Sequence, residues 1–216
     1  MKKIYSSSTT NISDINAQKL EKIKIFFLFS SALLLSATVG ILVARDISTE
    51  LYAGSLFRIS THFETAFLKC SKFVDCAKIV ALYSLSDVVS LLIIFAAAFS
   101  ILNYLITDMV LLYNGMKLGV TVAFLVNFND KNDSPYHVGN IRLFVFILFE
   151  LMILSLLLYY AYLAATSTDT LRRTESNGRP NIKTKDFFQF ATKTAACVGA
   201  VFIINSLYCL SLYILK

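Results

Sequence analysis

Charged residues are scarce in this chain of 216 residues. Only 16% of its residues are Asp, Glu, Lys or Arg, while 56% are hydrophobic; an average soluble domain has about 25% charged residues. The helices of a soluble domain would keep polar faces, whereas Leu91–Leu102 and Leu143–Ala165 are apolar nearly all round. This composition excludes an ordinary soluble domain and indicates helices surrounded by lipid.

Signatures of catalysis and of metal binding are also missing. The sequence contains no Gly-x-Ser-x-Gly, no His-Glu-x-x-His and no phosphate-binding glycine loop. His62 and His137 are far apart, and no Cys/His grouping has the spacing of metal ligands. We therefore expect no enzyme and no cofactor. The formal net charge of +6 comes from basic residues that cluster in the connectors, as in membrane proteins, so we expect no nucleic-acid partner.

Long apolar stretches dominate the rest of the chain. A helix needs about 20 mostly apolar residues to cross the hydrocarbon core of a bilayer, and within lipid its backbone must satisfy its own hydrogen bonds. The sequence therefore predicts an all-α, polytopic membrane helix bundle with five transmembrane helices, forming one membrane domain over residues 25–216. The predicted spans are about 25–44, 81–103, 108–128, 143–165 and 191–215.

The flanking segments predict the orientation. Residues 1–24 are predicted to be a cytoplasmic tail, and the Ser/Thr/Asn content of residues 1–18 is typical of disorder. Five basic residues precede the first span and five lie between the fourth and fifth, which favours a cell-membrane protein with its N-terminus inside and its C-terminus outside. The connector 45–80 also holds five basic residues, but it balances them with acidic ones.

The connector 45–80 is predicted to contain an amphipathic outer helix, because the apolar residues of Ile47–Ala77 recur three or four apart. This helix either packs on the bundle or docks a partner protein. In the docking alternative, the turn-rich loop Asn129–Asn140 contributes to the same docking surface. The sequence also leaves both possibilities for Cys70 and Cys76, a disulfide bond or two free thiols. Six residues of continuous helix rise about 9 Å, so the bond requires a break between these cysteines.

The second and third spans are separated only by Tyr104–Thr107. The sequence therefore predicts a tight turn there and an antiparallel hairpin. Asp108 follows this turn and is predicted to cap the N-terminus of the third helix.

Two ionisable residues lie deep within predicted spans. Lys117 and Glu150 are about 16 and 12 Å from the ends of their spans at the rise of a helix. Because a charge in lipid needs a partner or a use, we expect an interhelical ion pair that fixes the register of the bundle. A proton- or ion-coupled site is the functional alternative.

Small residues recur every four positions in the third span, at Gly115, Gly119 and Ala123. This spacing places them on one helix face and favours close helix packing, within the chain or between copies in a homo-oligomer. Further polar residues of the spans add interhelical hydrogen-bonding capacity: Asp87, Asn103, Asn114 and Asn205.

The run Asn114-Gly115-x-x-x-Gly119 resembles the Asn-Gly-x-x-x-Gly helix of stage II sporulation protein M-like proteins, and Glu150-Leu151 stands where that family has a Glu-Leu pair. The resemblance covers the layout of most of the chain, but residues 146–149 lack the family's frequent His-Gly. It implies a non-enzymatic membrane scaffold that docks partner proteins, which in spore formers are cell-wall hydrolases. The alternative is the membrane subunit of a transport or peptide-export system whose ATPase is another chain, as Lys117, Glu150 and Asp87 would allow.

Overall fold

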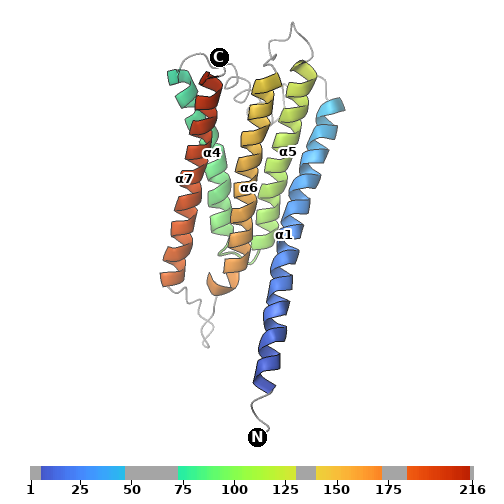
Figure 1. The fold of residues 1–216 in the computed structure, drawn as a ribbon, viewed down its shortest axis with the longest axis vertical. Helices are drawn as coiled ribbons and strands as arrows, with labels where there is room; N and C mark the ends of the chain where they lie inside the picture. The colour runs from blue at the N-terminus through green and yellow to red at the C-terminus, as the bar shows by residue number, and fades with distance from the viewer. Residues whose placement is uncertain (1–5, 47–72, 130–139, 172–183, 215–216) are drawn as a thin grey trace.

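The structure, a computed structural model, describes residues 6–46, 73–129, 140–171 and 184–214, and these residues form five helices (Figure 1). The predicted all-α class is confirmed. In the labels of Figure 1, the helices are α1 (Ser6–Asp46), α4 (Phe73–Ala97), α5 (Asn103–Asn129), α6 (Asn140–Leu171) and α7 (Thr184–Ile214).

Every one of these helices contains a stretch long and apolar enough to cross a membrane. Large apolar side chains on them face outward, such as Phe27 on α1 and Ile203 on α7, which are 68% and 62% exposed. Such exposure is costly in water and favourable in lipid. The chain is a multi-pass membrane protein with these candidate spans: Leu20–Ala44, Val80–Ala97, Asn103–Val126, Asn140–Ser167 and Lys185–Ser211.

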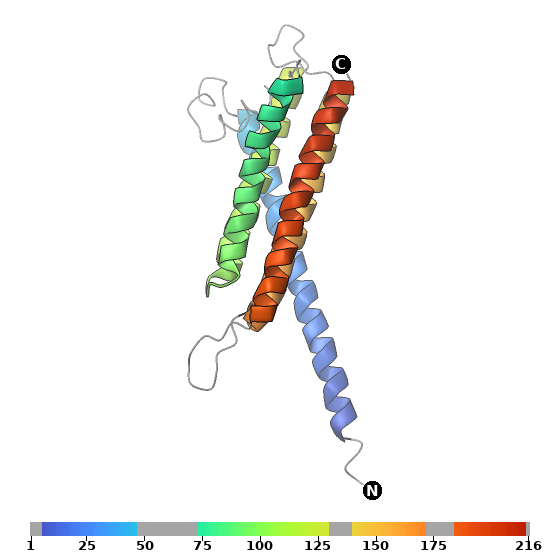
Figure 2. The ribbon, with the colours of Figure 1, turned by 90° about the vertical axis from the view of Figure 1, so that its left-hand side faces the viewer.

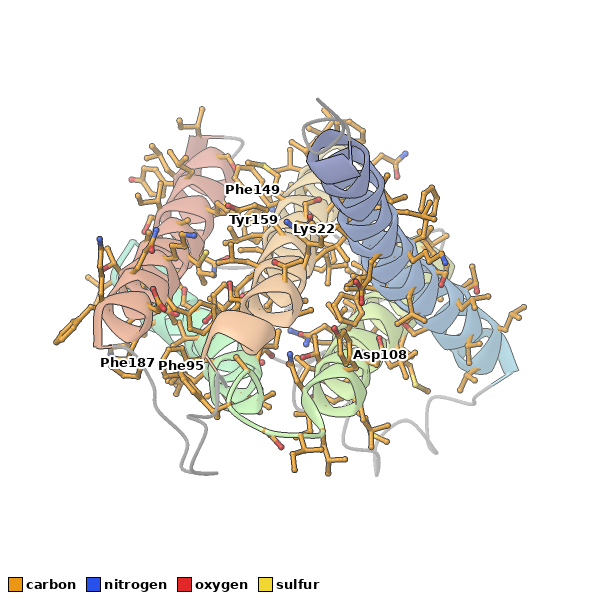
Figure 3. The ribbon with its side chains drawn as sticks, turned by 90° about the horizontal axis from the view of Figure 1, so that it is seen from below. Lys22, Phe95, Asp108, Phe149, Tyr159 and Phe187 are labelled. Atoms are coloured by element: carbon orange, nitrogen blue, oxygen red, sulfur yellow. The ribbon has the colours of Figure 1, made fainter. Side chains whose placement is uncertain are left out.

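One fully buried residue from each helix meets in the largest hydrophobic cluster. Each of these side chains has no exposed surface: Phe29, Leu91, Leu111, Leu157 and Val201. Helix α6 contacts the other four helices, α1 packs most extensively on α5, and α4 packs on α7. Seen along the bundle, α4 and α5 lie along the lower edge of the view, and α6 lies above them, between α7 and α1 (Figure 3).

Aromatic rings from different helices pack together at the lower end of the bundle in Figure 1, where α4 ends and α7 begins. The Phe95 ring of α4 stacks on the Phe190 ring of α7 with centroids 5.4 Å apart, and Phe190 stacks on Tyr160 of α6 at 5.9 Å. The Tyr160 hydroxyl forms a 2.6 Å hydrogen bond with the Thr194 hydroxyl. Phe187 lies beside Phe95 at 6.3 Å, as Figure 3 shows. Three helices are thereby joined at one level.

The turn between α4 and α5 lies earlier than predicted. α4 ends at Ala97 and α5 begins at Asn103, so the predicted turn at Tyr104–Thr107 is wrong. The backbone amide of Ser100 donates to the Ala97 carbonyl over 2.8 Å, which closes a tight turn inside an apolar run. The run from residue 91 to 102 contains no Gly or Pro, so nothing in its composition marks the break.

Because α5 begins at Asn103, Asp108 lies in its second turn and cannot cap the helix N-terminus. The predicted cap is therefore wrong. Asp108 Oδ1 is buried and has no hydrogen-bond partner in the described part of the chain. At the start of the helix, the Thr107 hydroxyl instead donates to Asn103 Oδ1 over 3.1 Å.

The N-terminal segment is helical from Ser6 onward, which corrects the prediction of a disordered tail for the described residues. Helix α1 is 41 residues long, begins at Ser6 and runs without interruption into its span. Extending an existing helix costs little once the span has nucleated it, even through residues of modest propensity. The part of α1 before its candidate span, which begins at Leu20, projects alone beyond the other helices (Figures 1 and 2).

Some predictions lie outside the described residues. The proposed outer helix falls mainly on residues 47–72, and the turn-rich loop on residues 130–139. The predicted Cys70–Cys76 disulfide also lies outside the described residues, because neither Cys70 nor the side chain of Cys76 is described.

Candidate functional site

Polar side chains gather inside the bundle where four spans meet. They share helix faces because their spacings are three, four or seven residues along α4 and α5. Each is less than 9% exposed although it lies within a membrane span. The polar cluster, as joined by contacts, consists of Ser84, Asp87 and Ser90 on α4, Asn114 and Lys117 on α5 and Asn205 on α7. Thr121 on α5 and Glu150 on α6 are likewise buried within their spans.

Asn205 joins α7 to α4 within the cluster. Its side-chain amide donates to the Ser84 hydroxyl over 2.9 Å and to Asp87 Oδ2 over 3.4 Å. Asn205 is 121 residues from Ser84 and 118 from Asp87 in the chain, so this contact is a long-range constraint on the fold. The predicted hydrogen-bonding capacity of Asn205 and Asp87 is used between helices.

Lys117 lies against α4 as well. Its ammonium nitrogen is 4.5 Å from the centroid of the Tyr83 ring, within the range of a cation–π interaction. The Asp87 carboxylate attracts the same ammonium electrostatically. Lys117 thus has the ring of Tyr83 and the carboxyl group of Asp87 beside it on the same helix, four residues apart. This arrangement compensates for part of the cost of placing its charge in a membrane.

Glu150 on α6 is 8% exposed, and like Lys117 it is engaged by neighbouring groups. Its helix packs on both α4 and α5. The predicted ion pair between Lys117 and Glu150 therefore stays a prediction. Asp87 adds a carboxylate to the surroundings of Lys117 that the expected pair did not include.

Asn114, the first residue of the family-like run, joins α5 to α4. Its amide donates to the Ser90 hydroxyl over 3.1 Å and to the Val110 carbonyl of its own helix over 2.8 Å. Ser90 in turn donates to the Ser86 carbonyl over 3.2 Å. Leu151, the last residue of that resemblance, is half exposed on the outside of α6, and its carbonyl accepts a hydrogen bond from the Ser155 hydroxyl of the same helix over 2.7 Å.

The glycines of α5 face α1. A Cβ added at Gly115 would overlap the Ser36 hydroxyl, and one added at Gly119 would overlap the Ala37 carbonyl oxygen. On the other side of the contact, a Cβ at Gly40 would lie 2.5 Å from the Met116 carbonyl oxygen. The structure therefore places these small residues at a close crossing of α1 and α5 within the chain. Ala123, third in the stripe, is also buried and belongs to a small cluster with Ala44 of α1.

Sequence reasoning missed the α1 half of this contact. Ser36, Gly40 and Ala44 repeat every four residues, the same small-residue spacing that singled out α5, and all three are buried. Scanning the first span for this spacing would have found them. The same four-residue spacing of small residues therefore marks both helices of this contact.

Within the described ranges, the structure groups no three His, Cys, Asp or Glu residues that could hold a metal ion. Cys197 and Cys209 are free thiols buried in α7, where they pack as small apolar side chains. The Thr121 hydroxyl is buried without a hydrogen-bond partner in the described part of the chain. The cluster consists of amides, hydroxyls and charges that join helices to one another.

Comparisons with protein-family models, with curated proteins and with solved structures give no match to this chain. The fold and the buried contacts therefore carry the functional argument. They define the class, a multi-pass membrane protein whose described residues form five candidate spans with a polar cluster between them.

Proposed function

We propose that the protein is a non-enzymatic membrane scaffold of the cell envelope, with its N-terminus in the cytoplasm and its C-terminus outside. The observation that carries this proposal is the form of α1. The span of α1 is packed against the glycines of α5, and the residues before the span project beyond the bundle. A long helix fixed at one end is suited to holding a partner at a set distance from the membrane.

The polar cluster supports the same function. Asn205, Asn114 and Lys117 each contact a side chain of α4, so α4, α5 and α7 are held together by directional contacts. A frame fixed in this way gives α1 a stable base. The residues of the family-like run serve this frame, since Asn114 contacts α4 while Gly115 and Gly119 admit α1.

The partner is expected on the cytoplasmic side, at residues 6–19 of α1. By the resemblance to stage II sporulation protein M-like proteins, the complex would also include cell-wall hydrolases, contacted on the outer side. The orientation is tested with reporter proteins fused in turn to each terminus. Active cytoplasmic reporters at both termini would contradict it.

The docking role is tested by bending the projecting helix. Ser13 lies eight residues into α1, well before the span. Proline in a helix interior costs about 3 kcal/mol and breaks or kinks the helix, whereas alanine at the same position preserves it. In mild detergent, partners that co-purify with the wild type and with Ser13→Ala should be lost with Ser13→Pro. A wild-type chain that always purifies alone contradicts the scaffold.

A second candidate function is that of a membrane subunit in a transport or export system. The observation in its favour is that Asp87, Lys117 and Glu150 are all buried within spans, where ionisable residues commonly mark ion or proton pathways. Proteoliposomes test it through ion flux. Flux by the wild type that disappears with Asp87→Asn and Glu150→Gln, and persists with the surface variant Ser206→Ala, would favour transport over the scaffold.

A further inference from the structure

Lys193 is an exposed lysine within a candidate membrane span. It lies eight residues into the stretch Lys185–Ser211 of α7, and its side chain faces the surroundings of the bundle. It differs in this from Asp87 and Lys117, which are buried between helices and attract each other. Because a charge in hydrocarbon needs a partner, we expect the partner of Lys193 to lie outside the bundle.

Aromatic contacts show how far Lys193 lies from the end of the bundle. The Phe99 ring beside the α4–α5 turn is 5.9 Å from the Phe187 ring, so this turn lies level with the start of α7. Lys193 follows Phe187 by six residues, a rise of about 9 Å. Apolar side chains are already exposed at the level of the turn, since Ile101 is 81% and Phe188 63% accessible. The backbone of Lys193 therefore lies inward of apolar, lipid-facing residues.

Polar side chains lead from Lys193 back to the end of the helix. Gln189 and Lys185 precede Lys193 by four and eight residues, so the three side chains lie on one helix face, and all three are exposed. Side chains of a helix lean toward its N-terminus, which brings the Lys193 ammonium toward the Gln189 amide. Helix α7 begins at the end of the bundle from which α1 projects (Figure 1). This polar face therefore opens toward the lipid headgroups at that end.

The charge of the polar face indicates its ligand. Two ammonium groups and an amide donor complement a phosphate, and lysines close to a membrane surface attract anionic lipids. The acidic residue of α7, Asp186, is half-buried and lies seven residues, about 10 Å, before Lys193. An acidic side chain on another transmembrane helix would meet Lys193 alone, whereas a headgroup reaches Lys193 past Lys185 and Gln189.

We propose that Lys193, Gln189 and Lys185 bind the headgroup of an anionic phospholipid, in the leaflet on the side of the N-terminus. The headgroup phosphate lies at the level of Gln189, where the Lys193 ammonium reaches it from above and Lys185 adds a second positive charge. The acyl chains extend along the apolar part of α7 beyond Lys193, where Ala196 and Ile203 are exposed. This inference does not depend on the scaffold role.

Tryptophan fluorescence in vesicles tests the site, because the chain contains no Trp. Ala196→Trp places the only indole three residues beyond Lys193, and Ile203→Trp places it farther along the lipid-facing side of the same helix. The vesicles are phosphatidylcholine with a small fraction of acyl-brominated lipid. At residue 196, brominated phosphatidylglycerol should quench more strongly than brominated phosphatidylcholine, and at residue 203 the two should quench alike. Equal quenching by the two lipids at residue 196 overturns the proposal.

Charge variants in the Ala196→Trp background assign the binding groups. Lys193→Gln should reduce the preference for phosphatidylglycerol about fivefold, the contribution of one lysine near a membrane surface, while Lys193→Arg should keep it. Lys24→Gln is the matched control, because Lys24 is an exposed lysine near the same end of the bundle, on α1. A preference that survives Lys193→Gln, or that falls as much with Lys24→Gln, contradicts a site at Lys193.

Two other ligands of the polar face would also overturn the proposal. Loss of the preference on adding inorganic phosphate at constant ionic strength would show that a free anion binds there. A second protein chain, detected by native mass spectrometry and lost with Lys193→Gln, would show that an acidic side chain pairs with Lys193. We expect neither result with the full chain.

Discussion

Gly119 of α5 lies directly against Ala37 of α1. A Cβ at Gly119 would overlap the Ala37 carbonyl oxygen and would come within 2.9 Å of its carbonyl carbon and 3.0 Å of the Ile41 nitrogen. All of these neighbouring atoms belong to the backbone, which cannot rotate away as a flexible side chain can. The two helices therefore approach each other as closely as they do only because residue 119 has no side chain.

Gly119→Ala is accordingly expected to destabilise the protein. Alanine favours a helix by about 1 kcal/mol over glycine, but overpacking a close contact costs about 1–3 kcal/mol and here requires the backbones to separate. Gly199→Ala is the matched control, because a Cβ at Gly199 meets nothing within 4 Å. Thermal unfolding in detergent should show a lower midpoint for Gly119→Ala and an unchanged or higher one for Gly199→Ala. Equal midpoints would contradict the close crossing.

The sequence allowed this helix architecture to be predicted because lipid imposes simple demands. A span must be about 20 residues long and apolar, and each of the five predicted spans has its helix. The ends of the helices were less predictable. The α4–α5 turn lies inside a continuous apolar run, and its position depends on bonds such as that from the Ser100 amide to the Ala97 carbonyl. The amino-acid composition of the run does not predict such backbone hydrogen bonds.

The site was only partly predictable for a similar reason. Spacing identifies which residues share one helix face, so Gly115 and Gly119 could be grouped from the sequence. It does not identify the facing helix. The closeness of Asp87 to Lys117 depends on α4 packing against α5, and Asn205 meets α4 only after the whole bundle has formed. These are tertiary relationships between distant segments.

Asn205→Leu is expected to loosen α7 from α4. It removes the donor to Ser84 and Asp87 and leaves both acceptors buried, at a cost of about 1–3 kcal/mol. Ser206→Ala is the neighbouring control, because the Ser206 hydroxyl bonds only its own helix, at the Phe202 carbonyl. Chemical denaturation in mixed micelles measures the difference. If the two variants are equally stable, the interhelical bonds do not hold α7.

The charge partner of Lys117 can be identified by removing charges in pairs. Lys117→Met leaves a buried carboxylate without its counter-charge, and breaking a buried pair costs about 3–5 kcal/mol. Because Asp87 attracts Lys117, we expect Asp87→Asn added to Lys117→Met to recover much of this loss. The folded yield and the thermal midpoint are the measurements.

Glu150→Gln in the Lys117→Met background is the second arm of that experiment. Recovery by Glu150→Gln alone would make the predicted Lys117–Glu150 pair the dominant one and would rule out Asp87 as the main partner. Recovery by both would mean that the two carboxylates share the ammonium. If neither restores stability, the charge of Lys117 is not paired with these groups.

The aromatic stack at the end of the bundle gives the last prediction. Phe190 is 3% exposed and stacks between Phe95 of α4 and Tyr160 of α6, so it joins three helices. Removing a buried phenylalanine side chain costs about 3–5 kcal/mol, because a cavity replaces its contacts. Phe190→Ala should therefore lower the thermal midpoint strongly. Phe188→Ala, two residues earlier and 63% exposed, should change it little. Since Phe187 also reaches Phe95 from α7, residual docking of α7 should remain in Phe190→Ala, and Phe187→Ala combined with Phe190→Ala should remove it. A double variant as stable as Phe188→Ala would show that the stack does not hold α7 to the bundle.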